Sequence, residues 1–374
     1  MLEKKIAFRA DASIEIGTGH IMRCLTLAHE LRNKGAQVYF ICRKLQGDLH
    51  QYILNKGFHV FVLDGDGENT NFLRTEHGSY LNWLKYHWFV DAQQTNDILS
   101  QLPNFDWLIV DHYGLDNKWE SALRKNVRKN VRKNVRKIMV IDDLANRMHD
   151  CDLLLDQNLY NNLNDRYKDL IPEHSLVKLG PKYAILRPEF HAANKFSRKR
   201  TGEIERIFIF FGGHDVTNET LKTLRALQNI DKDNLKIDVV VGSQNPHKEE
   251  IQTYCKSVSN ASFYCQIENM EEFLIRADLG IGAGGTTTWE RCFLGLPSIT
   301  ITTAQNQIEV TKTVAKVGAT WNIGTAESVS DKAITKCLNK LLSDYKIVKE
   351  MSNKALSIQC ASNSNEIAKL ILGG

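Results

Sequence analysis

Short apolar runs of strand length alternate with stretches patterned as helices along most of this chain. In the first half, strands are expected at residues 5–10, 37–42, 59–63, 107–111, 138–141 and 152–155. The second half repeats the scheme, with strands expected at residues 206–211, 238–241, 262–265, 278–281 and 298–301. Alternation of this kind predicts parallel sheets with helices on both faces. We therefore expect an α/β fold of two doubly wound, Rossmann-like domains that face a cleft.

The chain has 374 residues, which is enough for two domains of ordinary size. Between about residues 194 and 205 it becomes polar and basic, so we place a linker at 194–205. Residues 1–193 would then form an N-terminal α/β domain, and residues 206–374 a C-terminal one. Residues 363–372 have a helical pattern, and this last helix could return to the N-terminal domain.

Composition indicates a soluble globular protein, because 43% of the residues are hydrophobic and 25% are charged. Eight cysteines are scattered without a C-x-x-C pair, which argues against a zinc ribbon and against a disulfide framework. The N-terminus runs directly into an expected strand, and no run approaches the length of a membrane span. We therefore expect a cytoplasmic protein with reduced thiols.

Residues 124–137 form a tandem repeat, RKNVRKNVRKNVRK, that holds eight cations and no acids. One interpretation is a patch that binds nucleic acid or anionic lipid. The other, which we favour, is a solvated helix lengthened by repeat expansion, with Val127, Val131 and Val135 along one stripe. No aromatic residues are interleaved with the cations, so we expect neither a nucleic-acid partner nor a membrane partner. A non-catalytic nucleic-acid-binding protein stays an alternative function.

Residues 16–23, IGTGHIMR, stand between an expected strand and a helical stretch. This arrangement places His20 in or beside the first turn of the helix, where the helix dipole disfavours a charged imidazole. A neutral imidazole can accept a proton from water, so His20 is a candidate general base. The alternative is a turn histidine that only helps to cap the helix.

The same turn does not fit a dinucleotide cofactor. A G-x-G-x-x-G turn needs a third glycine where this chain has Met22, and the second expected strand is followed by Arg43 rather than an acid. We therefore expect no nicotinamide or flavin cofactor. Asp64-Gly65-Asp66 resembles a metal-binding D-x-D, but its surroundings are those of an ordinary loop, so we expect no metal site there.

Polar residues follow several expected strands of the first half. In a parallel sheet the carboxyl ends of the strands meet at one edge, where active sites lie. We expect these residues to line one rim with His20: Asp11, Asp111-His112-Tyr113, Asp142-Asp143 and Asp156-Gln157-Asn158.

Residues 282–290, GAGGTTTWE, follow a short buried run and open a helix. Glycines let a backbone approach a ligand closely, and free amides at a helix start attract phosphate. Glu290 lies about one turn into that helix, where a carboxylate could accept hydrogen bonds from ribose hydroxyls. The turn is not a P-loop, and a tight turn with a capping threonine is the alternative. A second glycine turn at Gly212-Gly213 strengthens the nucleotide hypothesis, and residues 305–307 place amides at another helix start.

Seven motifs carry a resemblance to a known family: Arg9-x-Asp11, residues 16–25, Asp111-His112-Tyr113, Ile141-Asp142-Asp143, residues 180–190, Phe211-Gly212-Gly213 and residues 284–290. In this order they resemble the UDP-sugar hydrolases of pseudaminic acid biosynthesis, the PseG family, which are related to the GT-B glycosyltransferases. The likeness runs from about residue 5 to residue 310, and the tandem at 124–137 is a departure from it.

The resemblance implies that water releases UDP from UDP-2,4-diacetamido-2,4,6-trideoxy-β-L-altropyranose, with inversion at the anomeric carbon and with His20 as the base. It needs no cofactor. The site residues then take three roles. Gly17 and Gly19 would bind the substrate from the turn at His20, while Asp11, Tyr113 and Asn158 could hold the sugar. The nucleotide would be bound by Arg187, Gly213, Gly284, Gly285, Thr286, Glu290 and Asn306. A GT-B glycosyltransferase acting on a UDP-sugar is the nearest alternative, and the oligomeric state is left open.

Overall fold

The computed structural model describes residues 3–64, 80–84, 87–102, 104–125, 135–195, 198–231 and 234–373. The chain forms two compact units. Unit 1 comprises Met1–Gln157, Asn162–Ile185 and Asn363–Gly374, and unit 2 comprises Asn158–Asn161 and Leu186–Ser362. The chain therefore leaves unit 1 and returns to it at the C-terminal end.

Unit 1 is built on a seven-stranded parallel sheet with the order β3-β2-β1-β4-β5-β6-β7. Its strands are β1 (Lys5–Ala10), β2 (Gln37–Arg43), β3 (His59–Leu63), β4 (Phe105–Asp111), β5 (Val135–Ile141), β6 (Leu153–Asp156) and β7 (Leu176–Leu179). The central β1 pairs with β2 on one side and with β4 on the other, and Ala10 lies opposite Asp111. The carboxyl ends of β1 and β4 are therefore neighbours.

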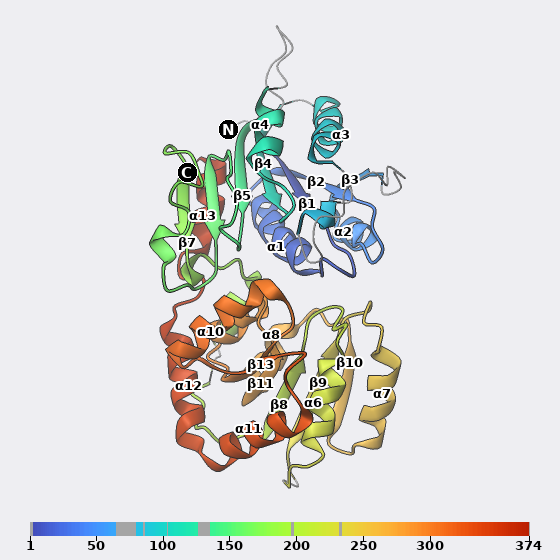
Figure 1. Cartoon of the computed structure of the whole chain (residues 1–374), viewed down its shortest axis with the longest axis vertical. Helices are drawn as coiled ribbons and strands as arrows, with labels where there is room; N and C mark the ends of the chain where they lie inside the picture. Colours follow the sequence, from blue (N-terminus) through green and yellow to red (C-terminus); the bar gives the residue numbers. More distant parts are fainter. Residues whose placement is uncertain are drawn as a thin grey trace. The chain divides into compact units, whose positions relative to one another are not determined.

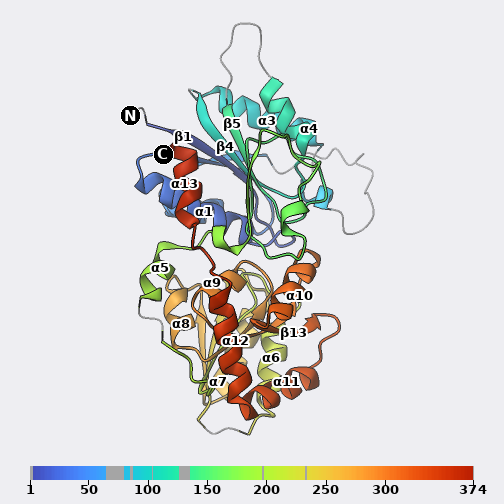
Figure 2. The same cartoon turned by 90° about the vertical axis from the view of Figure 1, so that its left-hand side faces the viewer.

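Helices cover both faces of this sheet (Figures 1 and 2). One face packs against α1 (Gly19–Asn33), α2 (His50–Asn55) and α13 (Ser364–Leu372). The other packs against α3 (Trp88–Ser100) and α4 (Asn117–Lys125). Short 3₁₀ turns add η1 (Tyr80–Leu84), η2 (Leu163–Asp165) and η3 (Pro181–Tyr183). The indole N–H of Trp107 donates to the carbonyl of Ile371 at 2.8 Å, which fastens α13 to the sheet.

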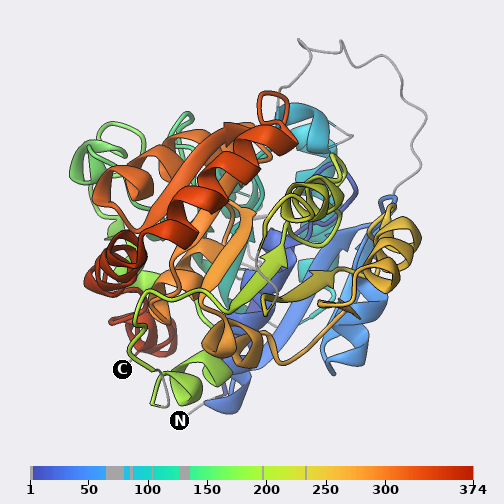
Figure 3. The ribbon, with the colours of Figure 1, turned by 90° about the horizontal axis from the view of Figure 1, so that it is seen from below.

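Unit 2 has a six-stranded parallel sheet with the order β10-β9-β8-β11-β12-β13 and helices on both faces (Figures 1 and 3). Its strands are β8 (Arg206–Phe210), β9 (Lys236–Val241), β10 (Ala261–Cys265), β11 (Leu279–Ala283), β12 (Ser298–Thr302) and β13 (Thr320–Thr325). Its helices are α5 (Pro188–Asn194), α6 (Glu219–Leu227), α7 (Lys248–Ser257), α8 (Met270–Arg276), α9 (Thr287–Phe293), α10 (Ile308–Val317), α11 (Asp331–Ser343) and α12 (Tyr345–Ser357), with the 3₁₀ turn η4 (Gln305–Gln307). Apolar side chains of α6, α7, α11 and α12 share one core with the strands.

The predicted α/β class with two Rossmann-like sheets is confirmed. Two strands lacked a clear signal in the sequence. β7 is a half-exposed strand at the end of its sheet, and β13 mixes threonine, asparagine and glycine with its apolar residues. The chain passes into unit 2 at Leu186, before the linker expected at 194–205, so that α5 lies in unit 2.

The prediction of a helix through the basic tandem is wrong at its C-terminal end. Helix α4 is described as far as Lys125, and Val135 is the first residue of β5, where it is buried and pairs with Phe105 of β4. A β-branched residue beside a neighbouring strand is well suited to this position. Residues 126–134 lie outside the described residues, as do Gly65 and Asp66 of the D-x-D motif.

A search of the described residues found no helix that is both long enough and apolar enough to cross a bilayer. The same residues contain no group of three or more His, Cys, Asp or Glu side chains arranged to hold a metal ion.

Candidate functional site

The turn between β1 and α1 sets the position of His20. Gly17 has a φ of 82°, a conformation that favours glycine, and its amide donates to the carbonyl of Ser13 at 2.8 Å. The hydroxyl of Ser13 in turn accepts the amide of Ile16 at 3.0 Å. Gly19 is the first residue of α1 and His20 the second, so the prediction that His20 lies in the first turn is confirmed.

His20 is buried, and its imidazole contacts the carboxylate of Asp111 at the end of the adjacent strand β4. The distance between His20 Nδ1 and Asp111 Oδ1 is 2.5 Å. Arg23, one turn further along α1, donates to the same carboxylate through Nε at 2.6 Å and Nη2 at 2.7 Å. The register of β1 with β4 and the spacing along α1 bring these three residues together.

This contact fixes the tautomer of the imidazole. Burial alone would raise the pKa of Asp111, but the charge of Arg23 and the hydrogen bonds from Arg23 and His20 hold that pKa well below its usual range. An ionised carboxylate can only accept hydrogen bonds, so Nδ1 of His20 carries the proton that faces Asp111. Nε2 is then the nitrogen with a lone pair, and it can accept a proton from water.

Tyr113 lies beside His20, with 4.6 Å between the ring centroids and the rings nearly perpendicular. Its hydroxyl donates to Asp143 Oδ2 at 2.5 Å, and the same oxygen accepts Arg23 Nη1 at 2.8 Å. Burial and the charge of Asp143 raise the pKa of Tyr113 well above its usual value, so the phenol stays a neutral donor. Trp83 of η1 stacks on Tyr113 with 5.4 Å between centroids.

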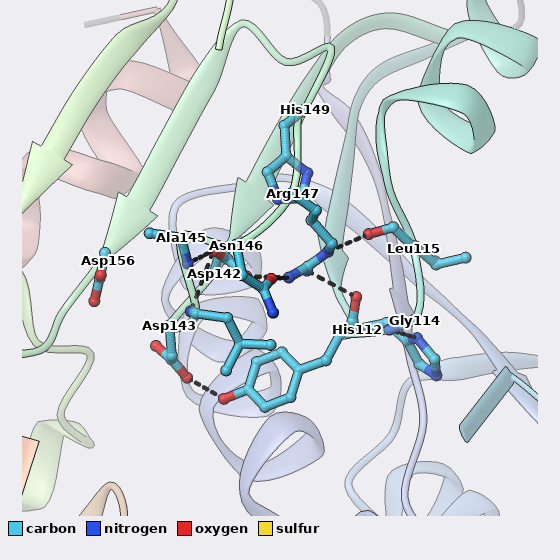
Figure 4. A network of polar contacts seen from close by, with 12 residues as sticks. His112, Gly114, Leu115, Asp142, Asp143, Ala145, Asn146, Arg147, His149 and Asp156 are labelled. Atoms are coloured by element: carbon cyan, nitrogen blue, oxygen red, sulfur yellow. Dashed lines mark hydrogen bonds and ion pairs between the residues drawn. The ribbon is translucent and has the colours of Figure 1, made fainter. Parts of the chain in front are cut away.

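Arg147 ties the loop after β4 to the loop after β5 (Figure 4). Its Nη1 lies 2.9 Å from Asp142 Oδ1, and its Nε donates to the carbonyl of Leu115 at 2.7 Å. Asp142 also accepts the backbone amide of Ala145 at 2.8 Å. These contacts hold the segments that carry Tyr113 and Asp143, which explains why the two side chains meet.

Asp11 lies in a second buried network at the same edge of the sheet. Its Oδ1 accepts Arg9 Nη1 at 2.6 Å and the backbone amide of Arg43 at 2.7 Å, and its Oδ2 lies 3.3 Å from Nε2 of His112. Arg9 and Arg43 both pair with Asp91 as well. Asp11 is fully buried, so these contacts give it a structural role, and its direct contact with a sugar stays a prediction.

The glycine-rich turn of unit 2 joins β11 to α9, as predicted. The amide of Gly284 donates to the side-chain oxygen of Gln307 at 3.2 Å, so this amide already has a protein partner. A Cβ on Gly284 would lie 2.2 Å from the hydroxyl oxygen of Thr311, which explains why this position needs glycine. At Gly285 the nearest atom to an added Cβ is 3.7 Å away, so its surroundings are more open.

Arg291, which the sequence did not single out, supports this turn from within the fold. Its Nη2 donates to the carbonyl of Ala283 at 2.9 Å and to the hydroxyl of Thr288 at 3.1 Å. A Cβ on Gly282 would lie 3.1 Å from Arg291 Nη1, so the glycine leaves room for the guanidinium. Burial lowers the pKa of Arg291 to about 10, and the group stays a cation at neutral pH.

Two contacts that involve predicted site residues lie within unit 2. Arg187 Nη2 lies 3.7 Å from Glu290 Oε1, and burial raises the pKa of Glu290 while Arg187 partly offsets that effect. The indole N–H of Trp289 donates to the side-chain oxygen of Asn158 at 3.1 Å. Arg187 and Asn158 therefore belong to unit 2, although the sequence placed both in the first domain.

The predicted residues fall into two groups. Asp11, Gly17, Gly19, His20 and Tyr113 lie in unit 1. Unit 2 holds the remainder: Asn158, Arg187, Gly213, Gly284, Gly285, Thr286, Glu290 and Asn306. The first group surrounds a histidine that can accept a proton, and the second surrounds the start of α9. Gly213 follows β8, where a Cβ on Gly242 of the neighbouring loop would lie 2.3 Å from the Gly213 carbonyl oxygen.

Comparisons with known proteins identify relatives of each part of the chain. Residues 206–371 match the family model described as glycosyltransferase family 28 C-terminal domain. The crystal structure of MurG from Acinetobacter baumannii is similar with a TM-score of 0.63, at 15% sequence identity, over 99% of this chain and 100% of that one. The chain has the GT-B fold. In this GT-B chain the family match covers the glycine-rich turn, Glu290 and Asn306.

Two relatives extend across both units. A Campylobacter jejuni protein named UDP-2,4-diacetamido-2,4,6-trideoxy-beta-L-altropyranose hydrolase is 27% identical over 316 residues, which are 84% of this chain and 97% of that protein. Protein MJ1062 of Methanocaldococcus jannaschii is 29% identical over 314 residues, which are 82% of this chain. The match spans only 56% of MJ1062, so that protein is considerably longer than the region it shares with this GT-B chain.

Proposed function

We propose that this protein hydrolyses UDP-2,4-diacetamido-2,4,6-trideoxy-β-L-altropyranose and releases UDP with inversion at the anomeric carbon. The observation that carries the proposal is the 2.5 Å contact between His20 Nδ1 and the ionised Asp111. It leaves Nε2 as a proton acceptor, which a hydrolase needs to activate water. The name of the Campylobacter jejuni relative supplies the substrate, and its match along most of both chains supports the transfer.

In the proposed step, Nε2 of His20 takes a proton from water as the water oxygen bonds to the anomeric carbon. The bond between that carbon and the diphosphate oxygen breaks, and its electron pair leaves with UDP. Attack on the side opposite the leaving group gives inversion. The imidazolium that forms is stabilised by the carboxylate of Asp111, because an opposite charge at hydrogen-bond distance favours the charged form.

Unit 2 would bind UDP. The amides of Gly285 and Thr286 at the start of α9 offer hydrogen-bond donors to the diphosphate, and the buried cation of Arg291 lies behind the same turn. Glu290 would accept hydrogen bonds from the ribose hydroxyls. Positive potential from these groups is our reason for proposing a reaction without metal. The roles of Tyr113, Asn158, Arg187, Gly213 and Asn306 in binding the substrate are part of the same proposal.

A glycosyltransferase is the second candidate, and the match of residues 206–371 to a glycosyltransferase domain favours it. Incubation with the UDP-sugar and no acceptor separates the two. A hydrolase releases UDP in proportion to enzyme and time, whereas a transferase releases little until an acceptor sugar is added.

The variant His20→Leu completes the test. Turnover should collapse by about 10²–10⁴-fold, which is the usual contribution of a general base. The affinity for UDP, measured by isothermal titration calorimetry, should stay near that of the wild type. Turnover that survives this substitution in a folded protein removes His20 as the base.

A further inference from the structure

Asp143 is connected to two of the residues that contact His20, Asp111 and Tyr113. It reaches Asp111 through Arg23, whose Nη1 contacts Asp143 while Nε and Nη2 contact Asp111. It also accepts the hydroxyl of Tyr113, whose ring packs against the imidazole. Asp143 is itself buried and follows β5, next to the segment that Arg147 fastens.

Among the residues that the structure describes, three elements contribute the charges around His20. On α1 lie Arg23 and Cys24; the thiol of Cys24 is neutral because burial and Asp111 raise its pKa well above the usual value. The end of β4 contributes Asp111, together with the neutral phenol of Tyr113.

After β5 comes Asp143, whose backbone carbonyl also accepts Arg166 Nη2 at 3.0 Å while Arg166 pairs with Asp156. From the η1 turn, the uncharged rings of Tyr80 and Trp83 lie at this site.

Asp111, Arg23 and Asp143 form one continuous chain of ion pairs beside the imidazole. Two carboxylates and one guanidinium leave an excess of one negative charge while His20 is neutral. The group becomes balanced when His20 takes up a proton. Without the negative charge of Asp143, Asp111 alone would have to balance two positive charges, the guanidinium of Arg23 and the imidazolium of His20.

We propose that Asp143 is a positioning residue for His20. Through Arg23 it sets the net charge of the Arg23–Asp111 pair beside the imidazole, and through Tyr113 it places the imidazole ring. The inference rests on the proposed function for its effect on catalysis. Its effect on the protonation of His20 is independent of any substrate.

Asp143→Asn isolates the charge. Arg23 Nη1 and the Tyr113 hydroxyl both donate to the same oxygen, Oδ2, so the single amide oxygen of Asn can accept both hydrogen bonds. Asp143→Glu keeps the charge and serves as the conservative variant. The matched control is Glu120→Gln, a buried carboxylate in unit 1 whose partner is a different histidine, His149, at 2.8 Å.

The first measurement follows the histidine Cε1–Hε1 signals by NMR as the pH is varied, with the His20 signal assigned by its loss in His20→Leu. In Asp143→Asn, His20 should take up its proton at a pH lower by about 0.5–1 unit than in the wild type, because a negative charge has been removed. Asp143→Glu should restore most of the difference, and Glu120→Gln should leave the His20 signal unchanged.

The second measurement is the pH profile of UDP release. Asp143→Asn should move the acid limb of kcat to lower pH and reduce kcat on the plateau by about three- to tenfold, because a weaker base transfers the proton less readily. KM should change little. If His20 titrates at the same pH in folded Asp143→Asn as in the wild type, Asp143 has no such role.

Asp143→Ser provides a second neutral variant if Asp143→Asn does not fold, and the same shift is expected in it. Because the NMR result needs no turnover, a protein that does not hydrolyse the UDP-sugar but shows the shift would overturn only the proposed function.

Discussion

Replacing Asp111 by Asn removes the carboxylate that holds the Nδ1 proton of His20, with almost no change in volume. The two oxygens of Asp111 accept donors on both sides: His20 Nδ1 and Arg23 Nη2 at Oδ1, and Arg23 Nε and the Cys24 thiol at Oδ2. Asn has one acceptor oxygen, so in either orientation its NH₂ group faces a donor. Asp111→Asn therefore breaks hydrogen bonds of residue 111, whereas Asp143→Asn keeps both side-chain hydrogen bonds of residue 143.

The magnitudes follow from burial. Asp111 is fully buried, and removing one partner of a buried ion pair costs about 3–5 kcal/mol. Arg23 keeps Asp143 at 2.8 Å, so we expect a loss near the lower end, about 3 kcal/mol in the free energy of unfolding. Turnover should fall by about 10²–10⁴-fold, because the imidazole loses the partner that keeps Nε2 free to accept a proton.

The assay compares UDP release, UDP affinity and urea unfolding for Asp111→Asn and the wild type. Asp106→Asn is the control, because Asp106 also pairs with a cation, Lys4 at 3.1 Å, but is partly exposed and outside the His20 network. UDP affinity should hardly change in either variant. A folded Asp111→Asn protein that retains turnover within about threefold of the wild type would refute the pairing of Asp111 with His20 as the basis of catalysis.

Three further predictions concern the nucleotide site and stability. Glu290→Ala should weaken UDP binding by about 1–3 kcal/mol, measured by calorimetry, and unchanged affinity would remove Glu290 from the site. Gly284→Ala should destabilise the protein, because the new methyl group would lie 2.2 Å from the hydroxyl oxygen of Thr311. A second substitution, Thr311→Ala, should restore much of the lost free energy of unfolding, measured in urea. No rescue by Thr311→Ala would contradict the steric cause. Burial opposes ionisation of Asp91 and Asp111, but arginines hold the pKa values of both carboxyls below the ordinary value. The stability that these ion pairs provide is therefore complete above about pH 4 and is lost as the pH falls further. An unfolding midpoint that is unchanged at pH 3 would contradict this.

The fold was predictable because its signal is repeated along the chain. Apolar runs of strand length, each followed by a helical pattern, indicate a parallel sheet wherever they recur. Ile21, Cys24, Leu25, Ala28 and Leu31 recur at helical spacing, and all five are buried on α1. β7 and β13 were missed because strands at the end of a sheet need less apolar patterning.

The partners within the site were less predictable. The sequence indicated that Asp111 and His20 lie at one rim, but the 2.5 Å contact depends on the register of β1 with β4, which no local pattern encodes. The sequence placed the positive end of a helix dipole at His20, which disfavours the imidazolium, whereas the carboxylate of Asp111 favours it.

In unit 2, the amide of Gly284 was expected to face a phosphate, yet Gln307, 23 residues further along the chain, accepts its hydrogen bond. Arg291 gave no signal, because its partner at the carbonyl of Ala283 is a backbone atom that no sequence pattern singles out.

In the proposed reaction, His20 directs water to the anomeric carbon of a UDP-sugar. Turnover of UDP-2,4-diacetamido-2,4,6-trideoxy-β-L-altropyranose in ¹⁸O-labelled water, without an acceptor, tests it directly by mass spectrometry and NMR of the products. We expect the label to enter the freed sugar at C1, the UDP to stay unlabelled and the first anomer formed to be inverted. His20→Leu should form almost none of either product. Label in the UDP would show cleavage at phosphorus, and attack of water at the anomeric carbon would then be wrong.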